Sequence, residues 1–337
     1  MTLLRSPKSI LNLAAVAMTI SYATSLLAAD GFTPTRTEHG QPDLQGIWTN
    51  ATQTPLERPR ELGNKRFFTD EERNNQEQQW LDYIAARSAQ SDPGRAPPTD
   101  GNTDLGYNNF WVDMGTEVNT INGEYRTSLI IEPEDGRIPY AEGSRERMMA
   151  RYANMGYDGP EGRPLGERCL MSFGSHAGPP MLPVMYNNNY QIVQTEEYVM
   201  ILAEMVHDAR IIPLNKEPGE FDFPKWLGNS VGYFEGDTLV VETRNFRDEQ
   251  LFRGATEDLI ITERFSMASE SEIVYSFTLN DPAGYSVPWT AEVQMKRRPP
   301  ESAQMYEYAC HEGNYALSGI LAGARQQEVN AEQEAGN

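Results

Sequence analysis

Cysteine and histidine are scarce in this chain of 337 residues, which has two of the first and four of the second. The histidines show no H-E-x-x-H spacing, so a zinc peptidase is not indicated. A phosphate-binding loop and a dinucleotide fingerprint are also missing. Ser175 and His176 are adjacent, but their Gly-rich and Pro-rich segment reads as a surface loop, without the strand, turn and helix that place a serine nucleophile. These features argue against zinc peptidases, nucleotide-binding enzymes and serine hydrolases.

Positive charge is the second shortage. Asp and Glu outnumber Lys and Arg by 49 to 28, which gives a formal net charge of −21. Such a chain repels phosphate backbones and anionic lipid headgroups, so we expect no nucleic-acid partner. The hydrophobic fraction of 39% is ordinary for a folded protein, and it argues for a real core rather than for disorder.

Long apolar runs are missing after residue 30, so we expect no membrane contact once the N-terminus is removed. The N-terminus itself has the layout of a secretory signal peptide over residues 1–29. Arg5 and Lys8 precede an apolar stretch that ends in small residues. Its removal takes away two positive charges and changes the formal charge from −21 to −23. We therefore predict a periplasmic or secreted protein.

The two cysteines are predicted to pair, because exported chains favour disulfides. A bond between Cys169 and Cys310 would close a long loop and stabilise the fold by about 4 kcal/mol in the chain-entropy model. Two separate buried thiols are the alternative. If the bond forms, it ties the segment around Glu167 to the segment "CHEGNY" near the C-terminus.

The first part of the mature chain, residues 30–110, reads as an N-terminal extension. It contains a strand near "GIWTN" and a helix over "FTDEERNNQEQQWLDYIAARS", followed by a polar loop rich in Pro and Gly. Thr69 and Glu72 have the spacing of a capping box, which predicts the start of the helix.

The second part, residues 111–325, changes to short runs of β-branched and aromatic residues separated by turns, such as Glu235 to Asp237. Many short strands at this spacing predict a mainly β fold, an antiparallel barrel or sandwich of lipocalin-like type with long irregular loops. The tail at residues 326–337 is polar and is predicted to be disordered.

Two sets of residues resemble those of known protein families, and both are consistent with a single β-barrel domain. Gly46 to Trp48 form a Gly-x-Trp triplet similar to that of lipocalins, in which a tryptophan plugs the end of the barrel. The segments that begin "ERCLMSFGSHAG", "WLGNSVGYFEGD" and "YEYACHEGNYAL" resemble a large family of exported, mostly hypothetical bacterial proteins over roughly residues 40–325. The resemblance to this family implies no activity and no catalytic residue.

The segment "EMVHDARIIP" carries the first candidate for chemistry. Strand alternation places Asp208 and Arg210 on one face and His207 on the other, among apolar neighbours. His207 then points into the barrel as a structural residue, as an acid or base at the floor of a pocket, or as a metal ligand.

The segment "CHEGNY" carries the second candidate. A disulfide at Cys310 would hold the following backbone rigidly, as a catalytic group requires. His311 and Glu312 are then predicted as acids or bases, and Tyr315 as a donor to a developing oxyanion. The alternative is that the cysteine only fastens a C-terminal loop.

Polar side chains beside aromatic ones predict a concave ligand site. Arg126, Arg168 and Arg244 are candidates for positioning an anionic group, and Arg210 is also expected to bind the substrate. The remaining expected substrate-binding residues are Trp111, Asn187, Asn188, Asn189 and Tyr190.

A set of His, Tyr and carboxylate groups without a nucleophile suits proton abstraction and return. We therefore predict an exported lyase, isomerase or dehydratase that needs no cofactor. Its substrate is expected to be a small polar ring compound, such as a sugar or a hydroxylated aromatic or terpenoid. Three alternatives stay open: a divalent metal at His207, His311 and a carboxylate, a lipocalin-like carrier of a hydrophobic molecule, and a structural module of the cell envelope.

Overall fold

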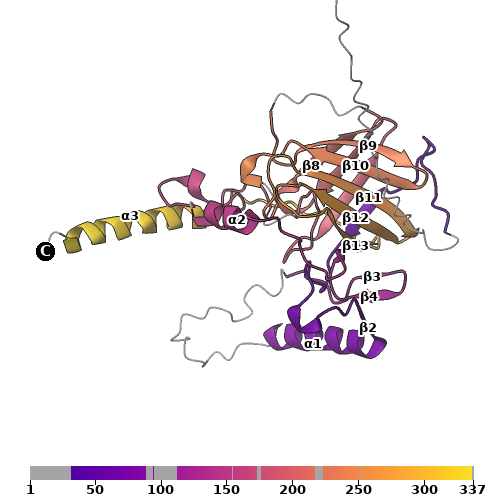
Figure 1. Ribbon diagram of the computed structural model, residues 1–337, viewed down its shortest axis with the longest axis horizontal. Coiled ribbons are helices and arrows are strands. Elements are labelled where there is room, and N and C mark those ends of the chain that lie inside the picture. The colour runs from indigo at the N-terminus through magenta and orange to yellow at the C-terminus, as the bar shows by residue number, and fades with distance from the viewer. Residues whose placement is uncertain are drawn as a thin grey trace, which may run out of the picture.

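The computed structural model describes residues 32–88, 94, 112–153, 155–172, 176–216, 223–250 and 252–335. The predicted signal peptide and Trp111 lie outside these ranges. Nine strands form one antiparallel sheet that is nearly closed into a barrel (Figure 1). The prediction of a mainly β antiparallel barrel with an N-terminal helix is therefore confirmed.

The order of the barrel strands begins at one free edge of the sheet and ends at the other. It is β8 (Ala209–Pro213), β7 (Tyr198–Ala203), β6 (Asn189–Gln194), β1 (Gly46–Thr49), β13 (Trp289–Arg297), β12 (Glu272–Asn280), β11 (Ile260–Ser269), β10 (Thr238–Arg244) and β9 (Asn229–Glu235). The short β5 (Ile130–Glu132) also pairs with β13. Since β1 pairs with β6 and β13, the first strand of the predicted N-terminal extension is part of the barrel.

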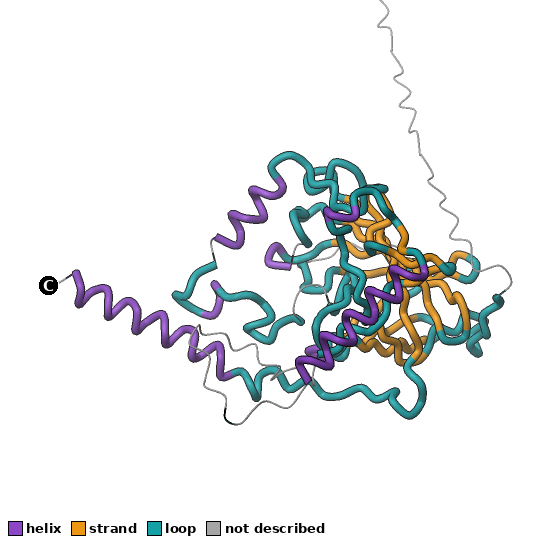
Figure 2. The backbone as a smooth tube through the Cα atoms, turned by 90° about the horizontal axis from the view of Figure 1, so that it is seen from below, coloured by secondary structure: helices purple, strands orange, loops and turns teal. Residues whose placement is uncertain are grey.

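The other elements lie outside the barrel. A small sheet has the order β2 (Phe67–Phe68), β4 (Glu124–Arg126) and β3 (Thr120–Ile121). The described helices are α1 (Asp70–Ser88), α2 (Ser144–Ala153) and α3 (Tyr315–Ala335), with 3-10 turns η1 (Arg60–Leu62), η3 (Pro160–Gly162), η4 (Met205–His207) and η5 (Asp248–Gln250). In Figure 2 the strands gather on one side of the molecule, and α3 extends away from them.

Local signals in the sequence account for several element boundaries. At the start of α1, the Thr69 amide donates to Glu72 Oε2 over 2.9 Å, and the Glu72 amide donates to Thr69 Oγ1 over 3.3 Å, which is the predicted capping box. Between β9 and β10, Gly236 takes a φ of 58°, so the predicted tight turn forms at the residue type that tolerates it.

The C-terminal tail differs from its prediction, because residues 326–335 belong to α3. Their Ala, Gln and Glu residues are good helix formers. Side-chain pairs along the helix support it further, with Arg325 bonded to Glu328 and Gln326 bonded to Asn330.

Alternate residues of β11 contribute to the core of the barrel. In β11, Ile261, Glu263, Phe265 and Met267 are buried, while the residues between them are only partly buried. Trp48 of the Gly-x-Trp triplet is fully buried, and the guanidinium of Arg297 lies 4.2 Å from the centroid of its ring.

A loop segment, residues 176–182, fills part of the interior and is buried along its whole length. Interior side chains bond its backbone: the Met181 amide donates to Tyr275 Oη over 2.9 Å, and Tyr190 Oη donates to the carbonyl of His176 over 2.8 Å. His176 is thus fully buried rather than at the surface, because the barrel walls supply the partners that its loop needs.

One ion pair lies inside the barrel. Both nitrogens of the Arg210 fork bond the two carboxylate oxygens of Glu263, and Tyr275 Oη donates to the same carboxylate over 2.8 Å. Burial opposes the charge on Arg210, but Glu263 outweighs this effect and raises its pKa. Because β8 and β11 lie near opposite edges of the sheet, the pair holds those edges together.

Glu263→Gln tests this assignment, since it leaves the Arg210 guanidinium buried without its counter-charge. We expect a loss of about 3 to 5 kcal/mol in the free energy of unfolding, measured by urea denaturation. The control is Arg264→Gln in the same strand, which removes only a surface pair with Glu235 and should cost less than about 1 kcal/mol. Equal losses would contradict the assignment.

Candidate functional site

The two free edges of the sheet, β8 and β9, meet at a seam. An odd number of antiparallel strands brings them together in parallel, and the contact is a bridge between Leu214 and Gly232. The Asn215 amide donates to the Gly232 carbonyl over 2.8 Å at that point. Near the starts of both strands a pocket of about 580 Å³ opens between them. This seam pocket is the candidate functional site.

The starts of β8 and β9 and the loop segments around them line the seam pocket. The residues are Met171, Asp208, Ala209, Arg210, Ile211, Pro213, Phe223, Pro224, Lys225, Trp226, Leu227, Gly228, Asn229, Ser230 and Arg247. Its size is that of a small-molecule site, and its lining is mostly apolar with a few polar groups, as in many ligand pockets.

Asp208 is the one carboxyl among the residues that line the seam pocket, and its pKa is perturbed. Burial raises the pKa of its carboxyl to about 6, although the charge of His207 opposes the shift. Its Oδ2 is buried and has no hydrogen-bond partner among the described residues. A carboxyl of this kind in a pocket is a candidate acid or base.

The backbone before Asp208 is strained. Val206 and His207, within η4, have φ values of 61° and 46°, a left-handed conformation that is rare outside glycine and unusual for β-branched valine. Such residues cost on the order of 1 to 3 kcal/mol each and gather at functional sites. This turn also breaks the predicted strand alternation, so His207 is exposed and does not point into the barrel.

Glu204 anchors the start of the same turn. It is buried, and its Oε1 accepts from Asn187 Nδ2 over 2.6 Å, while its Oε2 accepts from Asn189 Nδ2 over 3.2 Å. Asn188 is also buried and bonds the amide and the carbonyl of Val184. The three predicted substrate-binding asparagines therefore hold protein loops together and do not line the seam pocket.

Of the other predicted substrate-binding residues in the described ranges, only Arg210 lines the seam pocket. Tyr190 is fully buried, and its hydroxyl bonds His176 within the core. Arg210 does line the seam pocket, but its guanidinium is bonded to Glu263. Arg244 lies on β10, bonded to Glu242, and does not line the pocket.

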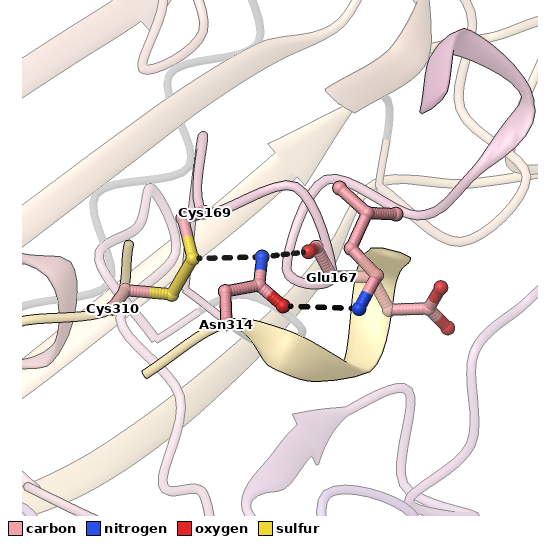
Figure 3. Close-up of a disulfide and its surroundings, with 5 residues drawn as sticks. Glu167, Cys169, Cys310 and Asn314 are labelled. Atoms are coloured by element: carbon pink, nitrogen blue, oxygen red, sulfur yellow. Dashed lines mark hydrogen bonds between the residues drawn. A yellow bond between two sulfur atoms is a disulfide. The ribbon is translucent and has the colours of Figure 1, made fainter. Parts of the chain in front are cut away.

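The predicted disulfide between Cys169 and Cys310 is confirmed, with 5.7 Å between the two Cα atoms (Figure 3). Beside it, Asn314 Nδ2 donates to the Glu167 carbonyl over 2.7 Å, and Asn314 Oδ1 accepts from the Leu317 amide over 3.3 Å. Asn314 therefore caps α3 and joins it to the segment that the disulfide also holds.

The catalytic candidates that follow Cys310 do not enter the seam pocket. His311 and Glu312 are exposed, and Tyr315, at the first position of α3, has 82% of its surface exposed. The turn after the disulfide presents these side chains to solvent, because α3 extends outward from the rest of the described chain (Figure 1). The disulfide at Cys310 therefore does not bring the residues that follow it in the sequence into the pocket.

Sequence reasoning missed several residues of the seam pocket. Lys225 and Trp226 stand in "FPKWLGNS", where a cation and an aromatic ring precede a glycine, and this pairing of charge with a flat ring could have marked a ligand loop. It also passed over the G-x-S-x-G pattern that runs from Gly228 to Gly232. Ser230 lies within β9 and not at a strand-to-helix turn, and its Oγ is 2.7 Å from Thr243 Oγ1.

Among the described residues, no cluster of three or more His, Cys, Asp or Glu side chains has the arrangement of a metal site. No described helix is both long and apolar enough to cross a bilayer.

No family model, curated protein or solved structure matches the chain. The resemblance to a family of exported proteins therefore stays a prediction.

Loss of the disulfide should weaken the clamp on the C-terminal segment. In the variant Cys169→Ser with Cys310→Ser, we expect the free energy of unfolding to fall by about 4 kcal/mol, measured in urea. Limited proteolysis should cut near residues 298–314 faster than in the oxidised protein. Reduced wild-type protein is the control and should behave like the variant. Unchanged stability in both would contradict the clamp.

Asp208→Asn tests the perturbed carboxyl. With a folded pKa near 6 and an unfolded value near 3.8, the unfolded chain loses this proton first, so wild-type stability falls as pH rises from about 4 to about 6. The variant lacks this loss, so its stability relative to wild type should increase across the same interval. Unfolding in urea at several pH values measures the difference, and Asp258→Asn, at an exposed site, is the control. A difference that does not change with pH would rule out the raised pKa.

Proposed function

We propose that the chain is an exported enzyme that moves a proton within a small ring-containing substrate, in a reaction of the lyase or isomerase type. One observation carries this proposal. Asp208 lines a pocket of substrate size, presents a buried oxygen without a partner among the described residues, and has a pKa near 6. Because both forms of such a carboxyl are populated near neutral pH, it can act first as a base and then as an acid.

In the proposed reaction, ionised Asp208 takes a proton from a carbon next to a carbonyl group. The electron pair of the broken C–H bond passes to the carbonyl oxygen and gives an enolate. Return of the proton to the opposite face of the same carbon, or to the far end of a double bond conjugated with the enolate, completes an isomerisation. If the enolate instead expels a β-hydroxyl group, that group takes the proton and leaves as water, which completes an elimination.

Two other pocket residues suit a negatively charged oxygen of the substrate. Asn229 is 4% exposed, and its Nδ2 is buried without a hydrogen-bond partner in the described part of the chain. The Lys225 ammonium has no salt-bridge partner within the described residues. Donors that are already in place hold a bound anionic substrate in one orientation against the base. In this scheme His207 acts on Asp208 through its charge, and His311, Glu312 and Tyr315 take no part.

The carrier alternative receives less support. A lipocalin-like carrier needs room for its ligand inside the barrel, where residues 176–182 and the Arg210–Glu263 pair lie. A charged pair and a buried loop are a poor lining for a hydrophobic ligand. Export itself rests on the predicted signal peptide, and the disulfide fits an oxidising compartment.

Exchange of substrate C–H hydrogens with D₂O tests the proposal, and a panel of candidate substrates is used because the substrate is not known. The oxidised protein is incubated in D₂O with a panel of cyclic keto acids and hydroxy acids, and the loss of C–H signals is followed by proton NMR. We expect exchange in at least one compound, and a fall of at least about 100-fold in Asp208→Asn. Asp258→Asn should keep the full rate. No exchange across the panel, or equal rates with Asp208→Asn, would refute the proposal.

A further inference from the structure

Charge makes the seam pocket unusual for this protein. The chain carries a formal net charge of −21, yet Lys225, Arg247 and Arg210 line the pocket against one acidic residue, Asp208. Arg210 is neutralised by Glu263, and Arg247 by Glu249, with 3.0 Å between the charged atoms of the second pair. Lys225 has no ion-pair partner among the described residues, so its positive charge is available to an anionic group on a ligand.

A second donor lies in the wall of the pocket. Asn229 begins β9, and its packing leaves the side chain 4% exposed, with Nδ2 unbonded within the described ranges. A buried amide without a partner costs free energy, and a ligand oxygen that accepts its hydrogen bond removes this cost. Asn229 and Lys225 therefore favour the same kind of ligand group, an acceptor with negative charge.

A flat ring is the second requirement. Trp226 lies between Lys225 and Asn229 in the chain, and the Arg247 guanidinium lies 4.1 Å from the centroid of its ring, which holds the indole in one orientation. Phe223 and Met171 supply further apolar wall. Aromatic surfaces of this kind stack well against planar or cyclic ligands.

We infer that the ligand of the seam pocket is a carboxylate-bearing ring compound, with its anionic group on Lys225 and Asn229 and its ring against Trp226. This inference rests on the proposed use of the pocket as an active site, and it narrows the substrate to cyclic or aromatic acids. Asp208 then lies at the part of the ligand away from the carboxylate, because two negative groups would repel each other.

A pair of dyes tests the inference. 8-Anilinonaphthalene-1-sulfonate carries an anionic group, while N-phenyl-1-naphthylamine has the same rings without it. Each is titrated into the full oxidised chain, and binding is read from dye fluorescence. We expect Lys225→Gln to weaken binding of the anionic dye by about tenfold and to leave the neutral dye within about twofold. Higher salt should weaken the anionic dye alone.

Two further variants complete the test. Lys296→Gln removes a lysine on β13, outside the pocket, and should change neither dye. Asn229→Asp keeps the side-chain size but adds a negative charge, so it should also weaken the anionic dye selectively. The inference is overturned if Lys225→Gln leaves the anionic dye unchanged, or if both dyes weaken equally.

The two proposals fail separately. Asp208→Asn should still bind the anionic dye, since it removes a repulsive charge and keeps the pocket. If it does so while wild-type protein shows no hydrogen exchange, the enzyme proposal fails and the anionic pocket stands. If exchange depends on Asp208 but the two dyes are not distinguished, the ligand class is wrong and the proton transfer stands.

Discussion

The ion pair between Arg210 and Glu263 is the interaction on which the barrel depends, because it joins edge strand β8 to β11, two strands in from the opposite edge of an incomplete cylinder. The backbone contact at the seam is confined, within the described residues, to the region of Leu214 and Gly232. Burial of two charges is costly, and here the cost is offset by a two-point contact and by the hydroxyl of Tyr275. The same hydroxyl bonds the amide of Met181, so the pair also fixes the segment that fills the interior.

The pocket follows from the way in which the barrel fails to close. An odd number of antiparallel strands forces a parallel seam, and the seam opens toward the starts of β8 and β9. At that end the chain enters β8 through the strained residues Val206 and His207, which turn Asp208 toward the gap. Strand edges that are not paired with each other leave room for a ligand, and polar side chains there, Asp208 and Asn229, keep atoms without partners among the described residues.

Signals that act over a few residues could be predicted from the sequence, because their partners are close in the chain. The capping box at Thr69 and the alternation in β11 are of this kind. The pairing of Cys169 with Cys310 was predictable because the chain holds only two cysteines. The places of Asn187 and His207 were not predictable, because Glu204 binds the first from across a loop and a left-handed turn redirects the second.

The disulfide supports one wall of the seam pocket, although the residues that follow Cys310 lie outside that pocket. Cys169 lies two residues before Met171, which is buried and lines the seam pocket, and His176 is buried in the barrel interior. The bond to Cys310 and the bond from Asn314 to Glu167 therefore hold the segment that forms one wall of the site. A clamp of this kind needs no chemistry of its own, so His311, Glu312 and Tyr315 can face solvent while the wall that Cys310 and Asn314 hold faces the pocket.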